Sequence, residues 1–271
     1  MLPRNPVHYS TSILMPTPPN YRIESLTDLR LLEECLEIQR EVWGFSDVDL
    51  LPTRMLVVSG RIGGQVLGAI SADGKLLGFL TATPGYRDGK TYLHSHMMGV
   101  LPQYRNLGIG RSLKLAQRQE ALNRGISMVE WTFDPLEIRN ANFNIKSLGA
   151  ICRRYYVNSY GVTSSPLHGK LPTDRLVAEW HLSSSRVRSR ISRTSFSLDA
   201  SKETVRVELP LNIQELKTAY PPVVACIQRD LRQRFLELFK QDFCVSRVEL
   251  DDSKKLASYL LEPFDKGLFL S

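Results

Sequence analysis

Apolar positions along the central part of the chain follow two periods, one typical of strands and one typical of helices. Residues 65–71 and 75–83 are short apolar runs joined by an Ala-Asp-Gly turn. Asp-Gly between two strand-like segments is a strong signal for a β-hairpin. Residues 28–43 instead place apolar side chains at helical spacing, with Asp28 as the expected N-cap. The pattern therefore predicts a helix followed by a hairpin.

The two periods continue along the chain. Strands are expected over residues 21–26, 65–71, 75–83, 92–100, 128–133, 151–160 and 177–182, and helices over residues 28–43, 109–125 and 140–148. Residues 45–59 fit either a short helix or an active-site loop. The predicted order is strand, helix, three strands, helix, strand, helix, strand, strand. This order indicates an α/β (α+β) fold with a mixed, twisted sheet flanked by helices.

The composition changes after residue 182. Residues 183–203 are rich in serine and carry Arg186, Arg188, Arg190 and Arg193. We expect a solvated linker or polar loop rather than an anion- or nucleic-acid-binding segment, because no aromatic residues interleave with the arginines to stack on bases. A strand over 204–209, a helix over 223–240 and a strand over 243–250 follow. They predict a C-terminal β-α-β appendage, either a small subdomain or a partial second half of the main domain.

Composition restricts the class of protein without identifying its partner. The 271 residues are 42% hydrophobic and 23% charged, which is typical of a soluble globular protein. The net charge of +7 permits nucleic acid, an anionic membrane or an acidic cofactor as a partner. The four cysteines are widely spaced and no histidines cluster, which argues against a metal site and for reduced thiols.

The N-terminal composition and the hydropathy indicate a cytoplasmic protein. Residues 1–19 are punctuated by prolines and lack a continuous apolar segment, so we expect a disordered lead-in and not a secretory signal. No apolar run approaches the roughly 20 residues that span a bilayer. We therefore expect a soluble protein that does not associate with a membrane.

The most informative stretch is residues 92–125, which predicts a strand, a short loop and a helix. Pro102 ends the strand, and Gly108 and Gly110 allow the backbone to turn tightly with its amides uncovered by side chains. Unpaired N–H groups at a helix N-terminus bind anions, because the helix dipole also favours negative charge there. Taken alone, the pattern also fits a dinucleotide-binding loop or an ordinary turn between a strand and a helix.

This stretch resembles motif A of the GNAT acetyltransferases. Val100-Leu-Pro102 precedes Arg105-Asn-Leu-Gly108-Ile-Gly110, which is similar to the family pattern Arg/Gln-x-x-Gly-x-Gly/Ala. A helix that begins at Asn140 and ends at Gly149, just before a strand, is similar to the second landmark of the family. Residues 131–150 and 171–180 are also similar to a bacterial branch of predicted acetyltransferases.

The resemblance implies a GNAT fold over residues 20–182, with residues 183–203 as the linker and residues 204–271 as a small C-terminal α/β subdomain. It implies that acetyl-CoA, or another acyl-CoA, is the co-substrate, with its diphosphate on the loop amides and its pantetheine along the preceding strand. The cofactor-binding residues expected on this basis are Met98, Gly99, Val100, Arg105, Asn106, Leu107, Gly108, Ile109, Gly110, Arg111, Asn140 and Asn144. No metal is expected.

Candidate catalytic residues lie on the strand before the loop and on its neighbours. A period of two places Tyr92, His94, His96, Met98 and Val100 on one face of that strand. His94 and His96 are placed like the histidine pair of arylalkylamine N-acetyltransferases, in which imidazoles accept the proton of the amine through water. The alternative is that either histidine simply packs within the sheet. Glu130 on the neighbouring strand is a reserve base, or else a solvent-facing or paired carboxylate.

The position of the general acid departs from the family pattern. Many GNAT enzymes carry a tyrosine four residues before the glycine that ends the second helix, and this chain has Ile145 there. Tyr156, together with Tyr155 and Tyr160, is a candidate acid on the following strand, although a strand tyrosine also fits a core position. Otherwise the proton for the leaving thiolate comes from water or from another group.

These features predict an acyl-CoA-dependent N-acyltransferase, most simply an N-acetyltransferase. An amine of a small molecule or peptide would attack the thioester directly in a ternary complex. The alternative, motivated by Ile145, is a non-catalytic CoA-binding sensor or scaffold with the same fold. No nucleic-acid partner is expected, and a homodimer is allowed.

Overall fold

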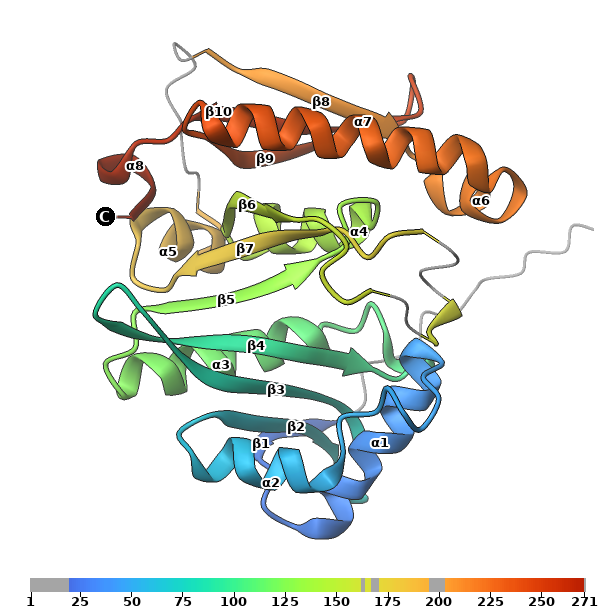
Figure 1. Ribbon diagram of the computed structural model, residues 1–271. Coiled ribbons are helices and arrows are strands. Elements are labelled where there is room, and N and C mark those ends of the chain that lie inside the picture. Colours follow the sequence, from blue (N-terminus) through green and yellow to red (C-terminus); the bar gives the residue numbers. More distant parts are fainter. Residues whose placement is uncertain (1–19, 162–163, 167–170, 195–202, 271) are drawn as a thin grey trace, which may run out of the picture.

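The computed structural model describes residues 20–161, 164–166, 171–194 and 203–270 (Figure 1). Its strands form a ten-stranded mixed sheet in the order β1-β2-β3-β4-β5-β7-β6-β9-β10-β8. The strands are β1 (Tyr21–Ser25), β2 (Gln65–Ser71), β3 (Leu76–Arg87), β4 (Lys90–Val100), β5 (Met128–Phe133), β6 (Ile151–Tyr156), β7 (Arg175–His181), β8 (Val205–Pro210), β9 (Phe243–Asp251) and β10 (Leu256–Pro263). The helices are α1 (Leu29–Trp43), α2 (Thr53–Arg61), η1 (Pro102–Tyr104), α3 (Ile109–Asn123), α4 (Ile138–Ala141), η2 (Asn142–Ser147), α5 (Ser185–Ser192), α6 (Ile213–Ala219), α7 (Pro221–Lys240) and α8 (Lys266–Leu270). The mixed α/β fold predicted from the sequence is confirmed, and the expected lead-in over residues 1–19 lies outside the described residues.

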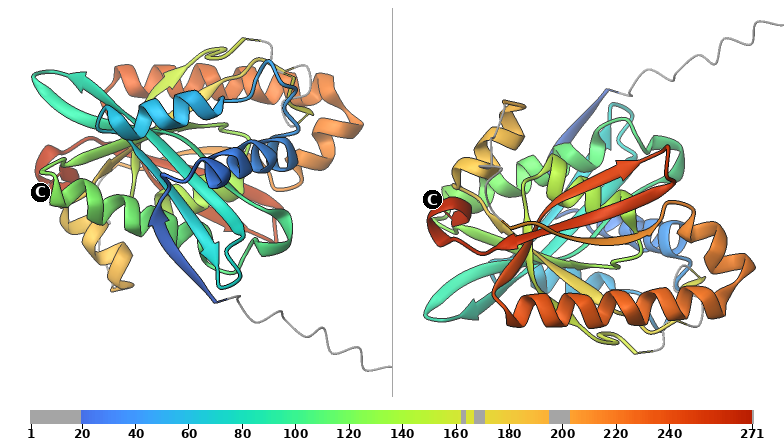
Figure 2. Two further views of the ribbon diagram at one scale, coloured as in Figure 1. Left: turned by 90° about the horizontal axis from the view of Figure 1, so that it is seen from below. Right: turned by 90° about the horizontal axis from the view of Figure 1, so that it is seen from above.

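Helices cover both faces of the N-terminal half of the sheet. On β3, Leu76 and Phe79 pack in a cluster with α1 and α2, whereas Leu77 and Leu80 pack in a cluster with α3. Because neighbouring residues of a strand point to opposite faces, α1 and α2 lie on one face and α3 lies on the other. Figure 2 shows β3 and β4 between these two layers. Asp28 caps α1 as predicted, since its carboxylate accepts a hydrogen bond of 2.8 Å from the backbone of the first turn.

Strands β4 and β5 are parallel and separate along their length. They pair only at Leu93↔Val129 and His94↔Glu130. Beyond His94, β4 remains paired with β3 as far as Val100, and no described strand pairs with its other edge. The two strands therefore diverge toward the N-terminal end of α3 (Figure 1), and we call the region between their unpaired parts the wedge.

A β-bulge in β4 changes the expected placement of its side chains. The pairing with β3 skips His96, which is the extra residue of the bulge. An extra residue reverses the alternation, so Tyr92 and His94 lie on the opposite face from Met98 and Val100. The expectation that these residues share one face is therefore wrong. Met98 accordingly packs beside α3.

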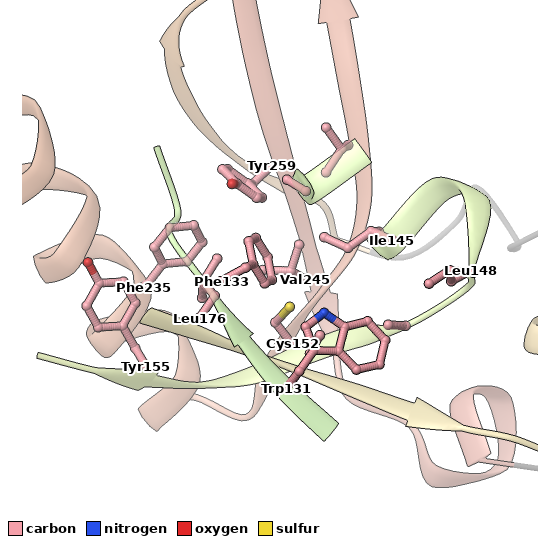
Figure 3. Close-up of a cluster of buried hydrophobic side chains, with 14 of the residues drawn as sticks. Trp131, Phe133, Ile145, Leu148, Cys152, Tyr155, Leu176, Phe235, Val245 and Tyr259 are labelled. Atoms are coloured by element: carbon pink, nitrogen blue, oxygen red, sulfur yellow. The ribbon is translucent and has the colours of Figure 1, made fainter. Parts of the chain in front are cut away.

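The C-terminal segment continues the main sheet. Strand β9 pairs with β6 at Cys152↔Val245, and β10 and β8 follow at the edge. Figure 3 shows Phe235 of α7 in one buried cluster with Phe133 and Tyr259, so both parts of the chain contribute to the same core. The expected β-α-β appendage contains a further strand, β10, and the helices α6 and α8. The division of the chain into a main domain and a C-terminal subdomain stays a prediction.

Helix α5 occupies part of the segment expected to be a linker or loop. The hydroxyl of Ser184 accepts a hydrogen bond of 3.3 Å from the Val187 amide and caps the helix. Arg111 of α3 donates a hydrogen bond of 2.7 Å to the Ile191 carbonyl near the end of α5, and Arg118 donates one of 2.8 Å to the Leu182 carbonyl, three residues before α5 begins. The structure thus differs from the expectation because these contacts and the buried Val187 hold the segment against α3. Residues 195–202 of the expected linker lie outside the described residues.

Candidate active site

Residues 106–111, at the junction of the β4–α3 loop and the first turn of α3, have the geometry of an anion-binding site, which we call the anion cradle. Gly108 is the N-cap of α3 with φ of 86°, a conformation that favours glycine, and it provides no side chain to cap the helix. The backbone N–H groups of residues 106–111 have no hydrogen-bond acceptor among the described residues. Free amides at the start of a helix are well placed to bind phosphate.

Gly110 is not required by the chain's own packing. Its φ is not in the left-handed region, and an added Cβ would meet the side chains of Met98 at 3.6 Å and Val100 at 4.0 Å, both ordinary contact distances. Without a side chain, this position leaves the backbone open to the approach of a ligand. Because the Met98 side chain of β4 lies beside Gly110, the anion cradle and the wedge are adjacent.

The remaining loop residues fall into separate environments. The Arg105 Nε donates a hydrogen bond of 3.2 Å to the Val100 carbonyl, so this exposed side chain folds back over the end of β4. The Ile109 side chain is buried in the core, so only its backbone faces the loop. The Arg111 guanidinium already donates to the carbonyl of Ile191 in α5. The loop therefore offers mainly backbone donors.

The two candidate histidines lie at the narrow end of the wedge. Their ring centroids are 6.4 Å apart. His94 Nδ1 lies 3.7 Å from Glu130 Oε1, at the last paired position of β4 and β5. The pKa of His96 is lowered from the ordinary value because desolvation disfavours the imidazolium, and the charge of His94 adds to this effect. The direction of this shift favours the neutral imidazole, the form that accepts a proton, although the His96 side chain itself is exposed.

Glu130 is the centre of an ion-pair network. Its Oε2 accepts hydrogen bonds of 2.7 Å from Arg87 and 2.6 Å from Arg154. Burial opposes the charged form, but the contacts with His94, Arg87 and Arg154 prevail and hold the pKa of Glu130 well below its usual range. A carboxylate of this kind is a weak base. The geometry thus favours the paired alternative for Glu130 over the role of reserve base.

Arg154 extends the network to the neighbouring strands. It donates to Glu179 on β7 at 3.0 Å, and its Nη1 lies 3.3 Å from the Tyr156 hydroxyl. Tyr156 is 44% exposed, so its hydroxyl is accessible from solvent beside a guanidinium. Tyr155, in contrast, is buried and donates a hydrogen bond of 2.7 Å to Asp174. The strand expected over 151–160 ends at Tyr156, so Tyr160 lies outside it, and of the two tyrosines on β6 Tyr156 is the better placed to deliver a proton.

The second landmark helix is divided into α4 and the π-helical η2. Asn140 is exposed on α4, Asn144 is buried on η2, and the buried Oδ1 of Asn142 has no hydrogen-bond partner among the described residues. Irregular π turns are frequent at functional sites. Ile145, at the position of the usual acid, is fully buried in the core cluster with Leu148 (Figure 3). The chain thus has a core residue where many family members carry a tyrosine.

Sequence reasoning missed several polar residues around the wedge. Arg87, Arg154 and Glu179 join the network only through strand pairing between distant segments, which no local pattern signals. Lys114 of α3 is buried below the wedge, where its Nζ lies 2.9 Å from the Ser95 hydroxyl and 3.7 Å from the centre of the Trp131 ring. Ser95 stands between the two histidines. A buried lysine at this point helps to fix the backbone that carries them.

The described part of the chain has no helix with the length and apolar character needed to cross a bilayer. Within the same residues, no group of three or more His, Cys, Asp or Glu side chains lies together as a metal site.

Structural neighbours are acetyltransferases of low sequence identity. NAA60 of Arabidopsis thaliana in complex with acetyl-CoA is 14% identical, with a TM-score of 0.49 over 59% of this chain and 98% of that one. An acetyltransferase of the GNAT family from Streptococcus pneumoniae is 14% identical, with a TM-score of 0.47 over 59% and 98% of the two chains. Aminoglycoside 6′-acetyltransferase type Ii is 18% identical, with a TM-score of 0.46 over 59% and 97%.

One protein-family model matches part of this sequence. A search of curated proteins finds no match to this sequence. Residues 29–149, from the first turn of α1 to the glycine after η2, match the sequence model of the Acetyltransferase (GNAT) family. This range includes β4, the anion cradle, α3 and the split helix. The sequence of residues 29–149 thus matches a GNAT acetyltransferase domain.

Proposed function

We propose that the protein is an acyl-CoA-dependent N-acyltransferase that transfers an acetyl group to the amine of a small molecule or peptide. The observation that carries the proposal is the row of free amides over residues 106–111, at the open end of the β4–β5 wedge and inside the family domain. Phosphate fits these donors, and an extended thiol-bearing chain fits the unpaired edge of β4.

The chain offers acyl-CoA a series of backbone contacts. The amides of residues 106–111 would hold the diphosphate, with Arg105 beside them. Backbone groups of Met98, Gly99 and Val100 on the free edge of β4 would bind the pantetheine. Asn140 would contact the same molecule from the second helix, whereas the Asn144 side chain is only 4% exposed and has little surface to offer it. A backbone N–H directed at the thioester oxygen would contribute roughly 3 kcal/mol, as in comparable oxyanion sites.

The reaction forms a C–N bond and breaks the C–S bond of the thioester. The ammonium form of the substrate must first lose a proton to become a nucleophile, and His96 would accept it directly or through water, because its lowered pKa favours the neutral ring; the second proton leaves the nitrogen for solvent as the amide forms. His94, held beside the ionised Glu130, would pass the proton toward solvent. Tyr156, beside Arg154, would protonate the leaving thiolate. Glu130 would orient His94 rather than act as the base.

A mixed panel of amines tests the enzymatic part of the proposal. Acetyl-CoA is incubated with the protein and the panel, and release of free thiol is followed over time. We expect release above the rate of hydrolysis with at least one amine, and loss of that release in the His96→Ala variant. Tight binding of acetyl-CoA with no release for any amine would instead favour the CoA-binding sensor or scaffold, for which buried Ile145 is the specific observation.

A further inference from the structure

Lys114 of α3 is buried beneath the wedge without an ionic partner. The residue is 2% exposed, and lysine is rarely buried unless an acid is paired with it. Among the described residues no carboxylate forms an ion pair with Lys114, and its Nζ donates instead to neutral oxygens, the Ser95 hydroxyl at 2.9 Å and the Gln117 amide at 3.0 Å. Burial lowers the pKa of Lys114 well below its ordinary value. An amine without a counter-charge costs free energy in a core, so packing alone does not explain this residue.

The amine of Lys114 lies at the point where β4 and β5 cease to pair. The last pair of the two strands is His94↔Glu130, so the next residues along them are Ser95 and Trp131. Lys114 contacts both, since its Nζ donates to Ser95 and lies 3.7 Å from the centre of the Trp131 ring. The amine therefore joins the two strands immediately beyond their last backbone pair.

Two buried glutamines hold the lysine in this place. The Nε2 of Gln117 donates to Gln65 Oε1 at 3.1 Å, and the Nε2 of Gln65 donates to the Gln117 carbonyl at 3.1 Å. Both side chains are buried, so the Lys114 amine is connected through them to β2. A buried network whose polar groups are paired makes the local geometry rigid.

The contact with Ser95 bears on the two candidate histidines, because Ser95 is the residue between them. Ser95 pairs with Ala82 of β3, and the next pair is Thr81↔Met97, so the bulge begins directly after Ser95. A shift of the pairing by one residue turns side chains to the opposite face of a sheet. Anchoring the Ser95 hydroxyl to α3 therefore fixes where the bulge begins, and with it the position of His96.

We propose that Lys114 is a positioning residue of the acyl transfer, which holds His96 at the wedge through its contact with Ser95. The inference rests on the proposed function, in which His96 accepts the proton of the amine. Lys114 is too buried to contact a substrate itself. A displacement of about 1 Å in an active site costs up to roughly 10²-fold in rate, so loss of the contact should lower kcat and leave the binding of acetyl-CoA intact.

The first test is Lys114→Met, which removes the amine and keeps a long side chain in the core. We expect kcat with the reactive amine of the panel to fall at least about tenfold, while calorimetry shows a change of less than about twofold in the Kd of acetyl-CoA. Ser95→Ala removes the other partner of the contact and should cause a similar loss. Because both changes break one contact, the double variant should lose no more than the larger single loss.

An exposed lysine provides the control for the removal of an amine. Lys75→Met, at the turn between β2 and β3, should leave kcat unchanged. Urea unfolding of each variant establishes that it is folded under the assay conditions. If Lys114→Met does not fold, Ser95→Ala carries the same comparisons, since it breaks the same contact by a smaller change.

A comparison in the His96→Ala background separates positioning from a structural role. There, Lys114→Met should lower kcat no further, because a residue that acts through His96 has no effect once the imidazole is absent. An equal loss in both backgrounds would overturn the proposal. A parent that releases no thiol with any amine contradicts the proposed function and this role together, whereas an active parent with a fully active Lys114→Met contradicts the role alone.

Discussion

At the scale of single residues, the bulge in β4 determines where the two candidate histidines lie in the wedge. It leaves His96 outside the strand pairing, while His94 remains at the last paired position opposite Glu130. The two imidazoles therefore occupy different environments although only one residue separates them. The pKa of His96 is lowered, which favours the neutral imidazole, whereas His94 stands next to the ionised Glu130.

The lowered pKa of His96 leads to a prediction about the pH dependence of activity. His96→Ala should lower kcat by about 10²–10⁴-fold, the usual contribution of a general base, with little change in acetyl-CoA binding. In the parent protein, kcat/KM should fall on acidification with a midpoint below 6.5, the ordinary histidine value, because the lowered pKa keeps the ring neutral to lower pH. Steady-state kinetics from pH 5 to 9 measure both effects. Full activity of the variant would exclude His96 as the base.

Glu130 gives a prediction for stability. Its pKa is depressed in the folded state, so its contribution is present above the unfolded value of about 4.5 and is lost as the pH falls further. Glu130→Gln removes the counter-charge of Arg87 and Arg154 and should cost about 3–5 kcal/mol of unfolding free energy at pH 7. Urea unfolding at pH 7 and pH 4 should show a smaller difference between variant and parent at pH 4.

An exposed pair provides the comparison for Glu130. Glu249→Gln breaks the contact with Arg206, whose side chain is 51% exposed, and should cost less than about 1 kcal/mol. Equal losses for the two variants would mean that the Glu130 network contributes no more than a surface ion pair.

At the scale of elements, the sequence predicted what depends on local patterns. The hairpin, α1 with its Asp28 cap, and the strand–loop–helix around Gly108 follow from short-range periodicity and turn chemistry. The bulge at His96 could not be predicted, since it exists only in the pairing with β3. Helix α5 was missed because its stability comes from contacts with α3 and not from its serine- and arginine-rich composition.

The two glycines of the loop should respond differently to the same change. Gly108→Ala places a Cβ at φ of 86° and should cost about 1–2 kcal/mol of stability. Gly110→Ala meets the side chains of Met98 at 3.6 Å and Val100 at 4.0 Å, both ordinary contacts, and should leave stability nearly unchanged, while it weakens acetyl-CoA binding. Urea unfolding and calorimetry of both variants test this contrast. Equal destabilisation by the two would remove the argument that Gly110 is kept for a ligand.

At the scale of the whole molecule, the continuous sheet joins the family domain to the C-terminal segment. Phe235 of α7 stacks on Tyr155 of β6 and meets Tyr259 of β10 edge-on, so the two parts share a core. Neither the pairing of β9 with β6 nor this shared cluster has a local signature, which is why the sequence predicted an appendage rather than an extension of the sheet.

A shared core predicts a single unfolding transition. Phe235→Ala should lower the unfolding free energy by about 3–5 kcal/mol, as expected for a buried aromatic residue. Tyr220→Ala, at an exposed site before α7, should have little effect. Fluorescence and circular dichroism should give coincident urea transitions for the parent and both variants. Two separate transitions would indicate that the C-terminal segment unfolds independently.

The most direct test of the account is the binding of acetyl-CoA to the cradle. Isothermal titration calorimetry compares the parent protein with Gly110→Glu, which places a carboxylate among the free amides, and with Gly60→Glu, an exposed position of α2 where a side chain meets no neighbour. We predict micromolar binding to the parent and to Gly60→Glu, and its loss in Gly110→Glu. Absence of binding to the parent, or undiminished binding to Gly110→Glu, would contradict the assignment of the cradle.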